Sequence, residues 1–173
     1  MRDSRQKTAR SWTWGVLPGF IVNEIAADPD RYCPGQLLDF GCGAGNITQQ
    51  LREHLAPYWL SVQGYDLGDP EVLLDMDYTV VHASSVLNVQ ESEEDLDATL
   101  SDLARAARCS DGTCSPVFAS YPQEPRKMGY NIEQLMRRIS GHPRVHNITP
   151  RKPGKNTTTK VFEIRFSTLS AYR

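Results

Sequence analysis

Short apolar segments recur along the chain and alternate with longer segments in which apolar residues are spaced three or four positions apart. The short segments are rich in β-branched and aromatic residues, so we predict that they are strands. The longer segments each carry one apolar stripe and are predicted to be helices. The predicted strands are Leu37–Phe40, Ser61–Asp66, Tyr78–Ala83, Val117–Ser120, Val145–Thr149 and Thr158–Phe166.

Glu91–Arg108 is the clearest predicted helix. Its apolar stripe includes Leu96 and Leu100, and Ser92 with Asp95 forms a capping-box signature at its start. Acidic residues fill its first turn and basic residues its last, as the helix dipole favours. The other predicted helices are Pro18–Ala27, Asn46–Ala56 with Asn46 as its N-cap, and Ile132–Ile139, which Asn131 caps and Gly141 ends.

Strands that alternate with helices indicate an α/β fold with a mostly parallel central sheet. The last two predicted strands follow each other without a helix, so we expect them to form an antiparallel hairpin. The link between the second and third strands, Leu67–Asp77, is too short for both a helix and a full strand. It has room only for a minimal edge strand, Val72–Leu74, so we predict a sheet that is shortened at one edge.

A glycine-rich turn follows the first predicted strand. Gly41, Gly43 and Gly45 stand at alternate positions, and their missing β-carbons let the backbone bend sharply and a ligand lie directly against it. The first amides of the helix that begins near Asn46 point outward from this turn and suit a polar or anionic group. The pattern predicts a nucleotide-type binding turn, and a tight strand-to-helix connection without a ligand is the alternative.

A carboxylate ends the second predicted strand. Asp66 is the last residue of this strand, and the carboxyl ends of neighbouring parallel strands lie side by side. Asp66 would therefore lie where a ribose diol can donate two hydrogen bonds to it.

These residues resemble the class I S-adenosylmethionine-dependent methyltransferases. The run from Asp39 to Gly45 matches that family's first motif, D/E-x-G-x-G-x-G, and Asp66 matches the acid at the end of its second strand. Tyr78–Val89 looks like the family's fourth strand and the turn after it. Nicotinamide-binding proteins space their glycines G-x-G-x-x-G, which would require a glycine where this chain has Asn46, so a dehydrogenase is disfavoured.

The resemblance covers Leu37 to Phe166 and implies a Rossmann-like methyltransferase sandwich that binds S-adenosyl-L-methionine. The family's acid that reads the adenine amino group has no secure counterpart here, and Asp75 is our candidate. The methionine end of the cofactor is expected near Ser84. The implied cofactor-binding residues are Asp39, Gly41, Cys42, Gly43, Gly45, Asn46, Asp66, Leu67, Asp75 and Ser84.

Polar residues after the later strands are predicted to line the substrate side of the same crevice. Ser84, Ser85 and Asn88 follow the third strand, and turn capping is the alternative role for Ser85. His82, inside that strand, is interpreted as a packed histidine rather than a base. If Val145–Thr149 runs parallel to the central strands, the basic residues after it reach this rim as well. The expected substrate-rim residues are Ser85, Asn88, Tyr121, Arg126, Lys127, Arg151, Lys152 and Lys155.

Charge divides the chain into two unlike segments. The formal net charge is only −2, but residues 61–120 contain twelve acidic and two basic residues, whereas residues 121–173 contain eleven basic and three acidic ones. A nucleic acid or another phosphate-bearing partner is therefore one expectation for the basic rim. The alternative is that the two segments neutralise each other on the folded surface.

The length of 173 residues predicts one domain, residues 1–173, in which residues 1–16 form a flexible basic arm. No apolar run approaches the ~20 residues of a membrane span, and the N-terminus lacks an apolar secretion core, so we expect a cytoplasmic protein. The cysteines form no C-x-x-C pairs, which argues against a metal site and favours free or structural thiols over a disulfide.

The predicted function is that of an S-adenosylmethionine-dependent methyltransferase with an unassigned acceptor. No N/D-P-P-Y/F sequence follows Ser84 and no Pro-Cys nucleophile is present, which disfavours amino-methylating DNA enzymes and cytosine-C5 enzymes. Methyl transfer depends mainly on alignment, so no catalytic residue is assigned. A nucleic acid or phosphorylated substrate and a small metabolite both stay open as acceptors. A non-catalytic cofactor-binding partner subunit or pseudo-enzyme, and an enzyme that cleaves the same cofactor, are the alternative functions.

Overall fold

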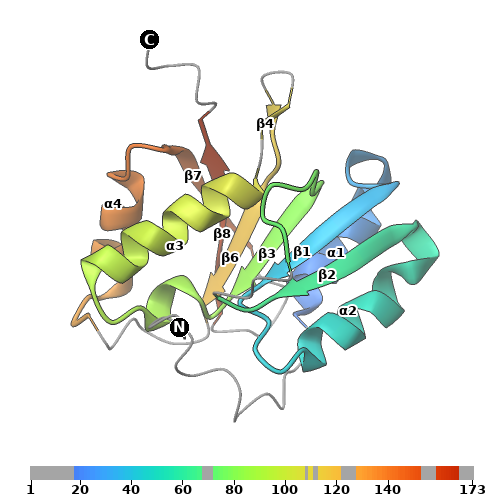
Figure 1. The fold of residues 1–173 in the computed structure, drawn as a ribbon, viewed down its shortest axis with the longest axis horizontal. Coiled ribbons are helices and arrows are strands. Elements are labelled where there is room, and N and C mark those ends of the chain that lie inside the picture. Colours follow the sequence, from blue (N-terminus) through green and yellow to red (C-terminus); the bar gives the residue numbers. More distant parts are fainter. Residues whose placement is uncertain are drawn as a thin grey trace.

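A six-stranded sheet forms the centre of the protein, and helices lie on both of its faces (Figure 1). The computed structural model describes residues 18–67, 72–107, 109–110, 113–121, 128–152 and 159–167. The strands of the sheet are β1 (Gly35–Phe40), β2 (Leu60–Tyr65), β3 (Val80–Ser84), β6 (Val117–Tyr121), β7 (Val145–Arg151) and β8 (Lys160–Phe166). A separate short hairpin consists of β4 (Cys109–Ser110) and β5 (Thr113–Cys114).

The order of strands in the sheet is β2-β1-β3-β6-β8-β7. β2, β1, β3 and β6 are parallel to one another, and β8 is antiparallel to both of its neighbours, β6 and β7. β7 therefore runs in the same direction as the central strands. The predicted C-terminal hairpin and the mostly parallel sheet are both confirmed.

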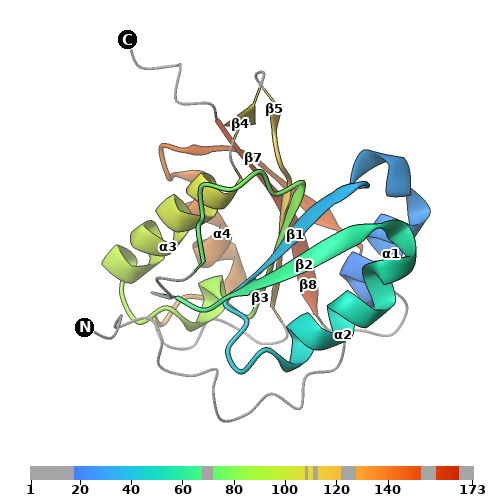
Figure 2. The ribbon, with the colours of Figure 1, turned by 45° about the vertical axis from the view of Figure 1, so that its right-hand side comes forward.

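Helices cover both faces of the sheet, as the turned view in Figure 2 shows. α1 (Gly19–Ala27) and α2 (Asn46–Leu55) pack on one face, and α3 (Glu93–Ala106) and α4 (Ile132–Ser140) pack on the other. β3 and β6 are buried along nearly their whole length, as parallel strands between two helical layers must be. The described residues also include the short 3₁₀ segments η1 (Pro29–Arg31), η2 (Ala56–Tyr58) and η3 (Leu87–Val89).

Side chains at the helix starts agree with the predicted caps, with one exception. The Ser92 hydroxyl accepts a 3.1 Å hydrogen bond from the amide three residues later, and Asn131 with Gln134 forms a reciprocal capping box at α4. The prediction that Asn46 caps α2 is wrong, because Gly45 is the N-cap and Asn46 is already helical. The N-cap position here has a φ of 83°, a left-handed value that favours glycine.

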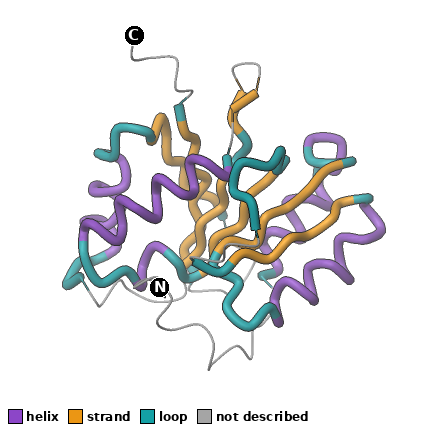
Figure 3. The backbone as a smooth tube through the Cα atoms, in the orientation of Figure 1, coloured by secondary structure: helices purple, strands orange, loops and turns teal. Residues whose placement is uncertain are grey.

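The link between β2 and β3 contains no strand in its described part, residues 66–67 and 72–79 (Figure 3). The prediction of an edge strand at Val72–Leu74 is therefore wrong. The chain has to return from the carboxyl end of β2 to the amino end of β3, and Leu74 and Tyr78 of the returning loop are buried in the core on the α3 side. The Tyr78 hydroxyl donates a 2.9 Å hydrogen bond to the Leu73 carbonyl, which stabilises the loop. β2 is consequently an edge strand of the sheet.

Two carbonyl oxygens on the outer edge of β2 accept hydrogen bonds from side chains. The Tyr65 carbonyl accepts hydrogen bonds from the residues that follow β1, so it points toward β1. Carbonyl groups of successive residues in a strand point to opposite sides, so those of Val62 and Gly64 point away from β1, toward the open edge of the sheet. Arg52 Nε donates to the Val62 oxygen at 2.9 Å, and Gln63 Nε2 donates to the Gly64 oxygen at 3.0 Å. These two bonds occupy acceptors that a further strand would use, and they protect the edge against unwanted pairing.

Replacing Arg52 by alanine is expected to increase self-association, because the Val62 carbonyl loses its donor and can pair with another chain. Sedimentation velocity over a series of protein concentrations measures this effect. The matched control is Arg137→Ala, which removes an exposed arginine from α4 and should leave sedimentation unchanged. If both variants sediment alike at every concentration, Arg52 does not protect the edge.

Candidate functional site

The turn between β1 and α2 is left-handed at three positions. Gly41, Gly43 and Gly45 have φ angles of 77°, 55° and 83°, a region that residues with a side chain seldom adopt. The amides of Gly41 and Cys42 both donate to the Tyr65 carbonyl, at 2.7 and 3.0 Å, and tie the turn to the end of β2. The Gly45 amide donates to the Cys42 carbonyl at 3.0 Å. The backbone geometry therefore requires the alternate glycines that the sequence contains.

Two of these glycines have different surroundings. A β-carbon on Gly41 would lie 2.6 Å from Cγ2 of Val86, so Gly41 is packed against the chain that follows β3. A β-carbon on Gly45 would meet no described atom within 4 Å. Open space therefore lies beside the backbone at the start of α2, where the amides of the first turn have no intrahelical partner.

Asp39 lies beneath the turn and is bonded to protein groups through both of its oxygens. Oδ2 accepts a 2.7 Å hydrogen bond from Thr48 Oγ1, and Oδ1 lies 3.1 Å from His82 Nδ1. The side chains of Asp39 and His82 are only 4% and 1% exposed. The interpretation of His82 as a packed histidine is confirmed. Asp39, which we expected among the cofactor contacts, points into the protein.

Asp66 directly follows β2 and lies at the same edge of the sheet as the glycine turn. The register of β1 with β2 pairs Phe40 with Tyr65, so the next residues, Gly41 and Asp66, are neighbours. Asp66 is 8% exposed. Leu67 belongs to the core on the α3 side. The structure thus brings the turn and the predicted ribose-binding carboxylate together.

The thiol of Cys42 is free and lies close to these carboxylates. Burial, together with Asp39 and Asp66, raises the pKa of Cys42 to about 11. The thiol is therefore protonated near neutral pH and is a poor nucleophile. Cys33 is also free, whereas Cys114 is disulfide-bonded, which corrects the expectation of free thiols for that residue.

Asp75 lies away from the glycine turn. Its Oδ2 is 2.7 Å from Nη2 of Arg105, and its side chain is 67% exposed. Arg105 is in the last turn of α3, and α3 leads back from the carboxyl end of β3 toward the amino end of β6. Asp75 is therefore near the amino ends of the strands, which corrects its expected contact with adenine. The physical reason is the short loop, which leads the chain directly back to the start of β3.

The carboxyl ends of β3 and β6 bring Ser84, Ser85 and Tyr121 to the same edge as the turn. Ser85 has a φ of 54°, and its amide donates to the Ser120 carbonyl at 2.8 Å. The Ser120 hydroxyl donates to the Ser84 hydroxyl oxygen at 3.2 Å. Ser85 therefore closes a turn, in agreement with the alternative role that the sequence left open.

Two of the expected rim residues are buried. Asn88, in η3, is 6% exposed and Tyr121 is 1% exposed. The Tyr121 ring packs against Phe162 with 5.5 Å between the ring centroids, and burial raises the pKa of its phenol. The Tyr121 hydroxyl has no hydrogen-bond partner in the part of the chain that the structure describes. Neither side chain forms an open rim.

β7 ends at the predicted edge, but Arg151 is bound to other parts of the protein. Its guanidinium nitrogens lie 2.6 Å from Glu24 of α1 and 3.5 Å from Glu163 of β8. Arg151 therefore stabilises the packing of α1, which corrects its expected place on an open basic rim. Lys152, the next residue, is exposed. The other expected basic residues, Arg126, Lys127 and Lys155, lie outside the described residues.

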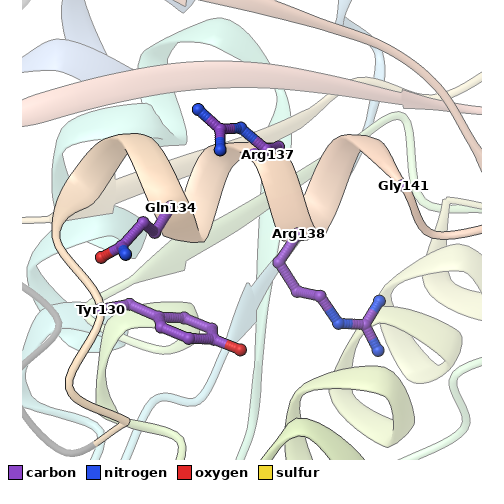
Figure 4. A pocket seen from close by; sticks show the side chains of 5 residues that line it. All are labelled: Tyr130, Gln134, Arg137, Arg138 and Gly141. Atoms are coloured by element: carbon purple, nitrogen blue, oxygen red, sulfur yellow. The ribbon is translucent and has the colours of Figure 1, made fainter.

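A shallow hollow of about 330 Å³ lies on α4 and contains none of the predicted cofactor residues (Figure 4). Arg137 and Arg138 point to opposite sides of the helix in this view, and Arg138 is held 2.7 Å from Asp97 of α3. The residues that line the hollow are Tyr130, Gln134, Arg137, Arg138 and Gly141.

Thr48 and Gly64 are parts of the site that sequence patterns did not single out. A β-carbon on Gly64 would lie 3.0 Å from Thr48 Oγ1 and 3.1 Å from Cys42 Sγ. Gly64 therefore lets both side chains lie against β2. A glycine inside a strand often marks such a close approach, and this signal was present in the sequence.

The fold is similar to that of several solved methyltransferase structures. An S-adenosylmethionine-dependent methyltransferase from Clostridium acetobutylicum has a TM-score of 0.56 and 10% identity over 88% of this chain and 91% of that chain. The N-methyltransferase NodS from Bradyrhizobium japonicum, in complex with S-adenosyl-L-homocysteine, has a TM-score of 0.53 and 12% identity over 94% of each chain. Human N-acetylserotonin methyltransferase, in complex with S-adenosylmethionine, has a TM-score of 0.55 and 12% identity over 90% of this chain and 53% of that chain. No family model and no curated protein sequence matches the chain.

The protein therefore has the Rossmann-like fold of the class I S-adenosylmethionine-dependent methyltransferases. At these identities the likeness defines the fold, and the activity has to be argued from the site. Within the described ranges, no three or more His, Cys, Asp and Glu side chains are grouped so that they could hold a metal ion. None of the helices there has the length and apolar character needed to span a bilayer.

Replacing Gly41 or Gly45 by alanine is expected to lower the free energy of unfolding by different amounts, because the two glycines have different surroundings. Gly45→Ala adds a left-handed alanine in open space, at about 1–2 kcal/mol. Gly41→Ala adds the same strain and a clash with Val86, which raises the cost by about 1–3 kcal/mol. Urea denaturation of both variants measures the free energy of unfolding. Equal losses, or a larger loss for Gly45→Ala, would contradict the packing described for Gly41.

Proposed function

We propose that this protein is an S-adenosylmethionine-dependent methyltransferase that holds its cofactor at the glycine turn. The observation that carries the proposal is the set of three left-handed glycines between β1 and α2, with Asp66 beside them at the end of β2. The fold shared with S-adenosylmethionine-dependent methyltransferases supports it.

The residues at this edge suit the cofactor in two respects. The open space beside Gly45 lets a charged ligand group approach the amides at the start of α2. An ionised Asp66 accepts hydrogen bonds only, as a ribose diol requires. The residues proposed to contact the cofactor are Gly41, Cys42, Gly43, Gly45, Asn46, Asp66 and Ser84.

The protein's main contribution to the reaction is alignment. The bound cofactor supplies a methyl group on a sulfonium, and holding two reactants in line can contribute about 7–11 kcal/mol. Burial keeps both the Cys42 thiol and the Tyr121 phenol protonated near neutral pH. Neither side chain is therefore proposed as a nucleophile, and we assign no general base among the described residues.

The acceptor stays open between a phosphate-bearing substrate, such as a nucleic acid, and a small metabolite. The positive charge of residues 121–173 favours the first class. The binding of Arg151 to Glu24 and Glu163 takes one cation away from the expected rim and weakens that argument. Lys152 is exposed, and Lys160, which pairs with Tyr121 at the carboxyl end of β6, is a second exposed cation near this edge.

A non-catalytic cofactor-binding partner subunit is the second candidate function. Asp75, the acid that the resemblance offered for adenine, lies near the amino ends of the strands and bonds to Arg105, so the described residues supply no such acid beside the glycine turn. Cofactor binding without methyl transfer until a partner protein is added would favour this candidate, and transfer by the isolated chain would exclude it. An enzyme that cleaves the same cofactor would instead form product without any acceptor.

Replacement of Asp66 by alanine is expected to weaken binding of S-adenosylhomocysteine by about tenfold or more, since about 1.4 kcal/mol corresponds to a factor of ten. Isothermal titration calorimetry measures the affinity, which we expect in the micromolar range for the unmodified chain. The matched control is Asp75→Ala. Asp75 is also an acid but lies near the amino ends of the strands, so its loss should leave the affinity for S-adenosylhomocysteine unchanged. An unmodified chain that does not bind, or an Asp66→Ala variant that binds normally, would contradict the proposal.

The salt dependence of oligonucleotide binding distinguishes the two classes of methyl acceptor. A nucleic-acid acceptor predicts binding to a mixed oligonucleotide pool that weakens steeply with salt, and a smaller salt slope in Lys152→Ala. A small metabolite acceptor predicts no oligonucleotide binding at any salt concentration. Fluorescence anisotropy of labelled oligonucleotides distinguishes the two outcomes.

A further inference from the structure

A buried polar cluster beneath the glycine turn has no part in the proposed chemistry. Asp39 accepts a 2.7 Å hydrogen bond from Thr48 and lies 3.1 Å from His82 Nδ1. The three residues come from three elements: the end of β1, the first turn of α2 and the middle of β3. Asp39, Thr48 and His82 are 3%, 3% and 1% exposed.

The Asp39–Thr48 bond joins the two ends of the turn. Asp39 precedes Gly41 by two residues, and Thr48 follows Gly45 by three. The Thr48 side chain also lies against β2, because Gly64 has no β-carbon there. One hydroxyl therefore links the start of α2 to β1, at the position where Thr48 contacts β2.

His82 attaches the same carboxylate to the neighbouring strand. The register of β1 with β3 places His82 directly opposite Asp39. A carboxylate only accepts hydrogen bonds, so Nδ1 of His82 carries the donated proton. The chain from β3 continues to Val86, which contacts the Gly41 position. One buried carboxylate on β1 is thus bonded to the start of α2 through Thr48 and to β3 through His82.

We propose that Asp39, Thr48 and His82 are positioning residues that hold the glycine turn in its ligand-binding shape without touching the cofactor. This inference rests on the proposed function. Both oxygens of Asp39 bond to protein groups and its side chain is 4% exposed, so it acts on a ligand only through the turn. A buried, hydrogen-bonded charge is costly to disturb, because loss of one partner leaves the charge incompletely bonded.

Thr48→Val tests the inference, because it removes the hydroxyl and keeps the shape of the side chain. We expect S-adenosylhomocysteine affinity to fall about tenfold. Loss of the Thr48 hydrogen bond to the Cys42 thiol would by itself raise the pKa of the thiol and slow its labelling. Labelling of Cys42 by iodoacetamide that is several times faster in the absence of any ligand, as we expect, therefore reports opening of the turn. Peptide mass spectrometry reports the labelling of Cys42 and of Cys33 separately. Cys33 lies between η1 and β1 and is the internal control, since its labelling should not change.

Thr48→Ser retains the hydroxyl and should restore both the affinity and the slow labelling of Cys42. His82→Asn places an amide donor near the position of Nδ1, whereas His82→Leu has no donor. The Asn variant should therefore bind S-adenosylhomocysteine more tightly than the Leu variant. If Thr48→Val is folded by circular dichroism and matches the unmodified protein in both assays, the inference is overturned. If an unmodified chain fails to bind S-adenosylhomocysteine, the proposed function is wrong, but the labelling of Cys42 still tests whether Thr48 holds the turn. Faster labelling of Cys33 as well would show general loosening of the fold and would also contradict the inference.

Discussion

The left-handed backbone between β1 and α2 is the constraint on which the candidate site depends. Gly41 has no room for a side chain because of Val86, whereas Gly45 has room and is limited by its φ angle alone. The turn is tied to β2 through the Tyr65 carbonyl and joined across its base by the Asp39–Thr48 hydrogen bond. Exposed backbone that is held this firmly can bind a ligand without reorganising, which favours tight binding.

The short link between β2 and β3 has several consequences for the protein. Leu74 and Tyr78 of the link help to cover the α3-side face of the sheet. β2 becomes an edge strand, and Arg52 bonds to an outward carbonyl that a neighbouring strand would otherwise use. The same link carries Asp75 to Arg105 and away from the glycine turn. One shortened segment therefore determines the sheet edge, part of the core and the position of Asp75.

Ion pairs already occupy several arginines of the basic segment. Arg138 of the basic segment lies 2.7 Å from Asp97 of the acidic segment. On the other face of the sheet, Glu163 is 7% exposed and lies within 3.5 Å of Arg31, Arg151 and Arg165. Such a buried carboxylate depends on all its partners, because an unpaired buried charge is costly. The positive charge left for a substrate is therefore smaller than the composition alone indicates.

The sequence by itself determined the β1–turn–α2–β2 unit, the helix caps at Ser92 and Asn131, and the shortened link, because these depend on local spacing and backbone conformation. It also predicted that Asp66 lies beside the turn, since the ends of neighbouring parallel strands meet. Only the tertiary structure decided the partners of individual charged groups. Arg151 and Glu24 are separated by 127 positions in the chain, and Asp39 and His82 by 43. No local pattern encodes such contacts, because they form only when the sheet order and the packing of the helices bring distant residues together.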